Sequence, residues 1–125
     1  RGVDLVLFSF TPLPKTSDKV YTYNIPEVEL RKIWDRKIIL VVDKTELVMG
    51  EADNKYRKKT AWTDNKAIVD IASNHMILDI TLFGLRKQKD VGATVLSMET
   101  SGFQNLEKML NNHKDNHIQL LKTSL

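Results

Sequence analysis

Residues 76–98 read MILDITLFGLRKQKDVGATVLSM, two apolar runs joined by a charged connection. In the first run, Leu78, Ile80 and Leu82 alternate with polar residues, a period of two that predicts a β-strand with one buried face. The second run shows a similar alternation. The connection, residues 84–90, concentrates basic side chains. The segment therefore predicts a β-hairpin with a basic tip.

The remaining pattern is also mostly that of strands. A capping-box pair, Ser101 with Gln104, precedes an apolar stripe of helical period and predicts one helix over residues 101–112. Residues 27–36 fit either a short helix or a bent strand. Further strands are predicted at residues 3–10, 19–25, 37–42, 55–62, 66–72 and 117–122. Strands at this spacing indicate an antiparallel sandwich or barrel with one late helix.

Composition limits the size and class of the protein. With 125 residues, 42% of them hydrophobic, the chain is expected to form a single domain over residues 1–125. It opens at Arg1 shortly before an apolar run, so we expect it to be cut from a longer protein. The net charge is +3, with both signs interspersed, so local basic clusters matter more than the total.

The sequence lacks the residue patterns of several classes of function. The chain has no cysteine, which removes disulfides, thiolate metal sites and cysteine nucleophiles. A nucleophile with a base, a phosphate-binding glycine loop and paired acids are not evident, so we expect no enzyme and no cofactor. His113 and His117 are four apart but lack a third metal ligand, and Trp34 and Trp62 are interpreted as core rather than as base-stacking platforms, so no metal or nucleic acid is expected. No apolar run approaches the roughly 18 to 20 residues of a membrane span, and no signal peptide is evident.

Residues 55–122 resemble a C2 domain. The matching features are a basic strand, a turn with Asn, an L-x-I-x-L-aromatic strand, an Asp-hydrophobic-Gly step and a short last strand. They are represented here by Arg57, Lys58, Lys59 and Thr60, by Asn65, by Leu78, Ile80, Leu82 and Phe83, by Asp90, Val91 and Gly92, and by Ile118, Leu120 and Leu121. The resemblance implies an eight-stranded antiparallel β-sandwich with one helix before the last strand. The alternative is a pleckstrin-homology-like barrel with a C-terminal helix, and a strand after the helix favours the C2 arrangement.

The resemblance also bears on calcium. Calcium-binding C2 domains have an Asp-x-Asp in the loop after the aromatic residue, since a hard cation needs carboxylate oxygens. Gly84 and Arg86 occupy the corresponding places here, and an arginine would repel the ion. Any function of this kind is therefore expected to be calcium-independent.

Two basic groups are the candidate binding residues. Lys55, Arg57 and Lys59 fall on one face of a predicted strand, a pattern that also fits a solvated edge. In the predicted loop, Leu85 offers an apolar wedge beside Arg86, Lys87 and Lys89, although a plain solvated turn would look the same. By resemblance, both groups are expected to contact acidic lipid headgroups.

The predicted function is that of a cytoplasmic, non-catalytic, peripheral membrane or phospholipid-binding module. Its partner would be an anionic phospholipid surface, and the chain would not span the membrane. The alternative is a protein–protein interaction scaffold that binds no lipid.

Overall fold

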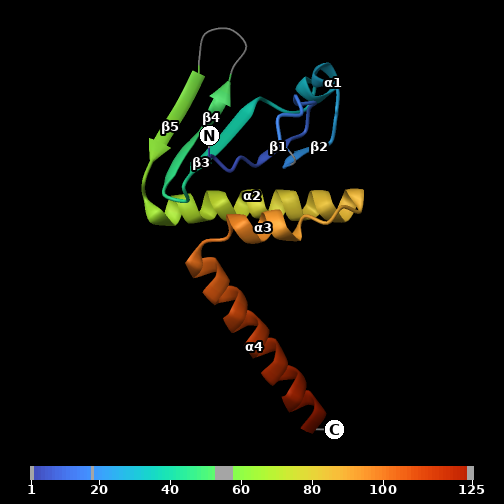
Figure 1. The fold of residues 1–125 in the computed structure, drawn as a ribbon, viewed down its shortest axis with the longest axis vertical. Coiled ribbons are helices and arrows are strands. Elements are labelled where there is room, and N and C mark those ends of the chain that lie inside the picture. Colours follow the sequence, from blue (N-terminus) through green and yellow to red (C-terminus); the bar gives the residue numbers. More distant parts are fainter. Residues whose placement is uncertain (1, 18, 53–57, 124–125) are drawn as a thin grey trace.

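The computed structural model describes the backbone of residues 2–17, 19–52 and 58–123, and the side chains of these residues other than 52, 58 and 114–123. The described chain forms five short strands in two small sheets, together with four helices (Figure 1). The predicted eight-stranded sandwich is therefore wrong, and so is the alternative barrel. The main reason is that residues 66–98, predicted as strands, are helical.

The larger sheet has the order β3-β4-β5 and is antiparallel throughout, with β3 at Lys37–Val42, β4 at Glu46–Ala52 and β5 at Lys58–Thr63. The strand predicted at residues 37–42 is confirmed. The three residues 43–45 join β3 to β4, and the first two, Asp43 and Lys44, have φ angles of 51° and 60°. Such a turn matches the twist of the paired strands. Val48 lies in the middle of the sheet, paired with Leu40 on one side and Trp62 on the other.

Helix α2, Lys66–Lys87, is the longest element of the body. Its first turn is capped by Asn65, whose side chain accepts a hydrogen bond from the Ile68 amide at 3.3 Å. It ends where Gln88 adopts a left-handed conformation and the Lys89 amide donates to the Gly84 carbonyl at 2.9 Å. The strands predicted at residues 66–72 and in the first run of residues 76–98 are therefore wrong.

One side of α2 packs into the fold. Its buried residues recur at helical spacing and are Val69, Ala72, Ser73, Ile77, Ile80, Phe83 and Gly84. Val69 and Ala72 form a core cluster with Leu47 of β4, against which Ile39 and Val41 of β3 also pack. The helix therefore covers one face of the three-stranded sheet.

Two more helices complete the C-terminal part. Helix α3, Gly92–Met98, contacts α2 and replaces the second predicted strand of the hairpin. Helix α4, Ser101–Thr123, confirms the helix predicted at residues 101–112 but continues through residues 117–122, where the last strand was predicted. Its cap is Thr100, which accepts the Phe103 amide hydrogen bond at 3.1 Å, one residue earlier than the capping-box pattern indicated. Figure 1 shows α4 leaving the body.

The N-terminal part is a separate small unit beside the larger sheet. Strands β1, Leu7–Ser9, and β2, Val20–Thr22, are parallel, and α1, Glu27–Arg31, follows them. The strands predicted at residues 3–10 and 19–25 are thus present but short, and the helical option for residues 27–36 is confirmed over its first half. Aromatic rings of this unit, including Phe8, Tyr21 and Tyr23, surround Phe83 of α2.

Candidate functional site

The structure describes only part of the first predicted basic group and places the second in a different element from the one predicted. Lys55 and Arg57 lie outside the described residues, so their predicted stripe is described only at Lys59, an exposed residue of β5. Leu85, Arg86 and Lys87 are exposed on the last turn of α2 instead of in a loop, and Lys89 follows the helix end. The predicted hairpin tip is therefore the end of a helix.

The cations at this helix end lie next to the aromatic cluster around Phe83. Arg86 Cζ and Lys87 Nζ are 6.0 and 5.8 Å from the Tyr23 ring centre, and Lys89 Nζ is 5.9 Å from that of Phe83. These distances are near the outer limit of cation–π attraction, where an exposed pair contributes on the order of 0.5 to 1 kcal/mol. The rings therefore help to gather three positive charges at one end of α2.

The side of α2 that faces away from the core is also apolar. We call its exposed residues the outward stripe: Ile68, Ile71, Leu78, Leu82 and Leu85, with exposures between 44% and 73%. With His75, their spacing alternates between three and four residues, so they form one line along the helix. His75 Nε2 lies 3.2 Å from a carboxylate oxygen of Asp79. The line runs from the first to the last turn of α2, which also carries Arg86 and Lys87, with Lys87 on the opposite side of the helix from Leu85.

Only the last member of this stripe, Leu85, is predicted as an exposed binding residue from the sequence. Leu78 and Leu82 were assigned to the buried side of a strand together with Ile80, and Ile71 to another strand. A scan at a period of 3.6 residues would have found the stripe, since its members recur every three or four positions.

Helix α2 is also long and apolar enough to cross a membrane, judged by length and composition alone. It has 22 residues, and 39% of its most apolar window is buried inside the fold. The expectation that no segment approaches the length of a membrane span is therefore wrong. The helix contains a few polar residues, such as Asp70 and Asp79, so its apolar character is an average and not an unbroken run.

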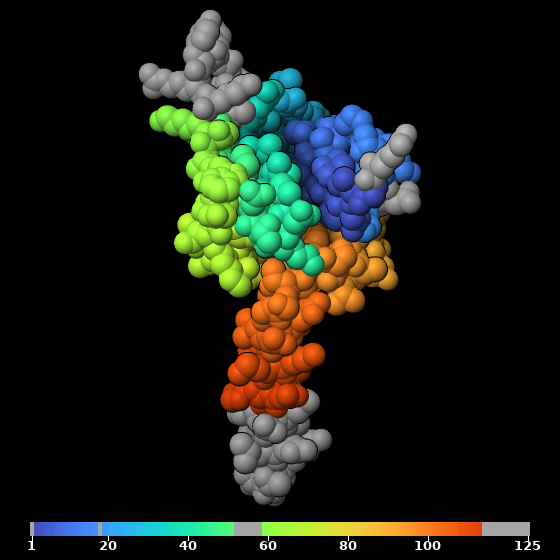
Figure 2. Space-filling model, turned by 60° about the vertical axis from the view of Figure 1, so that its left-hand side comes forward, coloured from blue at the N-terminus to red at the C-terminus, as the bar shows by residue number. Residues whose placement is uncertain are grey.

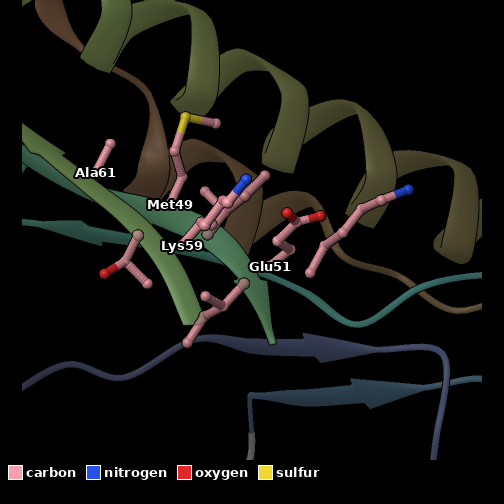
Figure 3. Close-up of a pocket in the computed structure, with 9 residues that line it drawn as sticks. Met49, Glu51, Lys59 and Ala61 are labelled. Carbon is pink, nitrogen blue, oxygen red and sulfur yellow. The ribbon is translucent and has the colours of Figure 1, made fainter. Parts of the chain in front are cut away.

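A groove of about 480 Å³ opens on the α2 side of the sheet, beyond the end that α2 covers (Figure 3). Its residues come from all three strands of the larger sheet and are Lys37, Ile38, Ile39, Met49, Gly50, Glu51, Lys59, Thr60 and Ala61. Ile39, Met49 and Ala61 form one cross-strand row, and Lys37, Glu51 and Lys59 the next. The groove thus has an apolar floor and a mixed-charge rim, and one of the predicted residues, Lys59, belongs to that rim.

A candidate metal site is not present among the described residues. Groups of three or more His, Asp or Glu side chains able to hold a metal ion are absent there. The side chain of His117, one of the paired histidines, lies outside the described residues.

No protein-family model, curated protein or solved structure matches this chain.

Proposed function

We propose that this chain is a non-catalytic module that binds anionic membrane surfaces without calcium, through the outward stripe of α2 and the cations at its C-terminal end. The observation that supports this most is that the exposed Leu78, Leu82 and Leu85 reach the last turn of α2, where Arg86 and Lys87 are also exposed. An apolar helix face next to basic residues is the pattern of helices that lie in the membrane interface.

Both parts, the apolar stripe and the cations, contribute to the binding free energy. Fully burying a leucine or isoleucine side chain contributes about 1.5 to 3 kcal/mol, and the stripe residues have roughly half to three quarters of their surface available for it. Each basic residue near an anionic surface adds about 1 kcal/mol, screened within a Debye length. The three cations thus account for about 3 kcal/mol, or a hundredfold in partitioning. The cytoplasmic leaflet is anionic, in keeping with a cytoplasmic location.

A peripheral position suits α2 better than a transmembrane one. Ile80 and Val69 on its inward side are at most 1% exposed, and the side chains that cover this face include Leu47. Spanning the bilayer would require the sheet and α3 to leave this face. Lying in the interface leaves the packed face intact and buries only the outward stripe.

The test is co-sedimentation with vesicles of phosphatidylcholine alone or with 30% phosphatidylserine. We expect binding to the mixed vesicles that falls as salt is raised from 0.1 to 0.5 M. Changing Arg86, Lys87 and Lys89 to Glu should weaken partitioning at least a hundredfold, and changing Leu82 and Leu85 to Asn should weaken it by more than tenfold.

Matched controls keep the net charge and exposed apolar area comparable. Changing Lys15, Lys32 and Lys108 to Glu reverses the same number of charges elsewhere, and changing Leu96 to Asn alters an exposed leucine of α3. Neither control should reduce binding appreciably. Failure of the unmodified chain to bind mixed vesicles at 0.1 M salt would refute the proposal.

A scaffold function without lipid binding is the second candidate. It is favoured by a separate apolar surface, the outer face of the larger sheet, where Trp62 is 59% and Ile38 52% exposed. This function would be supported over the first if the chain did not bind anionic vesicles but formed a protein complex that persists at high salt.

A further inference from the structure

Two apolar surfaces of this chain are uncovered within the described residues and are distinct from the outward stripe of α2. The first is the outer face of the larger sheet, turned away from α2 and formed by Ile38, Leu40, Val42, Val48 and Trp62. The second is the apolar side of α4, formed by Phe103, Leu106, Met109 and Leu110. Figure 2 shows strands of the sheet at the surface of the body and α4 protruding from it.

We propose that the chain forms a dimer in which α4 of each copy packs on the outer sheet face of the other. Such an exchange gives each of the two uncovered surfaces an apolar partner. It also builds the usual layer arrangement, in which helices cover both faces of a sheet.

The start of α4 is linked to the body of the fold. Only Glu99 and Thr100 separate α3 from α4, and Lys44 Nζ donates a hydrogen bond to the Glu99 carbonyl at 3.1 Å. Thr100 accepts hydrogen bonds from the amides of Phe103 and Gln104. The hydrogen bond from Lys44 joins Glu99 to the turn between β3 and β4, and the helix leaves the body from this point (Figure 1). In this position the apolar side of α4 is open to another molecule.

The two surfaces match in dimension. Ile38, Leu40 and Val42 repeat every second residue along β3, a step of roughly 6.6 Å. Leu106 and Leu110 are four residues apart on α4, a step of about 6 Å. With such similar steps, side chains of α4 can pack between those of β3 when the helix lies along the strand.

They also match in area. On the scale of 150 to 250 Å² for a large side chain, each surface exposes on the order of 400 Å² of side chain. One contact thus buries on the order of 800 Å², and a reciprocal pair buries on the order of 1,600 Å², the size of a standard stable interface. Because a single contact would reach only half that size, the reciprocal arrangement is favoured, and it closes as a twofold dimer.

The first experiment measures mass by light scattering over 1 to 100 µM protein, without lipid. We expect about twice 14.4 kDa, the mass of one chain, at the upper concentrations. Changing Leu106 and Leu110 to Asn, or Trp62 to Ser, should each weaken the dimer at least a hundredfold. These side chains are exposed in the single chain, so the variants should fold. Leu82→Asn and Leu85→Asn, which test the membrane proposal, should leave the dimer intact.

The second experiment identifies the contact. Because the chain has no cysteine, two introduced thiols are the only ones present. A tagged Val48→Cys chain is mixed with an untagged Leu106→Cys chain and mildly oxidised, and we expect mainly the mixed disulfide. Lys108→Cys, on the opposite side of α4, should give little of it. A monomer at every concentration would overturn the proposal, and so would a Leu106→Cys chain that crosslinks mainly to itself, which would show α4 pairing with α4.

Discussion

Gly50 shows how one residue constrains the sheet. It lies inside β4 and is paired with Thr60 of β5 on the outer side of the sheet. A Cβ at this position would come within 2.8 Å of the Thr60 Cα and 2.9 Å of its Cγ2. The close backbone approach of β5 therefore requires glycine here.

We expect Gly50→Ala to destabilise the fold by about 1 to 3 kcal/mol, the range for an overpacked site. Urea unfolding monitored by circular dichroism would measure it. Gly102→Ala is the control, because a Cβ there meets only the Thr100 hydroxyl oxygen at 3.9 Å and alanine favours a helix by up to about 1 kcal/mol. Equal stability of Gly50→Ala and the unmodified chain would contradict the close approach of β4 and β5.

At the scale of elements, α2 is the one whose sequence supports two structures. Leu78, Ile80 and Leu82 share one face of a strand but not of a helix. In the structure Ile80 is fully buried, whereas Leu78 and Leu82 are 61% and 45% exposed. Because both sides of the helix carry apolar residues, those residues fall at every second position here, which is the pattern of a strand.

Alanine substitutions at these positions distinguish the two structures. Ile80→Ala should cost about 2 to 5 kcal/mol, because it leaves a cavity on the packed side of α2. Leu78→Ala and Leu82→Ala should each cost less, about 1 kcal/mol, since roughly half of their surface is already in water. Chemical denaturation of the three variants is the measurement. Similar large losses at all three positions would indicate a strand and contradict α2.

At the scale of the whole molecule, the N-terminal unit depends on contacts with segments far along the chain. The Tyr21 hydroxyl and the Thr94 hydroxyl of α3 are 2.6 Å apart, and Thr94 is buried. This hydrogen bond joins β2 to α3 across 73 residues of sequence.

A double-mutant cycle tests this link. Tyr21→Phe and Thr94→Val should show a coupling of about 1 kcal/mol in the free energy of unfolding, as expected for a hydrogen bond between neutral groups. Tyr23→Phe, in the same aromatic cluster, has no hydroxyl partner among the described residues and should show no coupling to Thr94→Val. Additive losses from Tyr21→Phe and Thr94→Val would mean that the N-terminal unit is not held to α3 in this way.

The sequence by itself determined the features that depend on short-range patterns. The run at residues 37–42 is short and rich in β-branched residues, which favours a strand, and the helix beginning at residue 101 has a single apolar stripe, which fits the helical period. The exposed Leu85, Arg86, Lys87 and Lys89 were also identified, since charged residues seldom become buried.

The tertiary structure decided what residues 66–98 become. Asn65 and Gln88 cap one long helix there, and α3 replaces the second arm of the predicted hairpin. Apolar residues on every side of a segment satisfy both periods, so only the partner that covers one side selects between them. Here β3 and β4 cover one side of α2 and leave the other exposed. The segment predicted as a hairpin with a basic tip is thus the end of α2 followed by α3, and the same basic residues lie at and just after the end of α2.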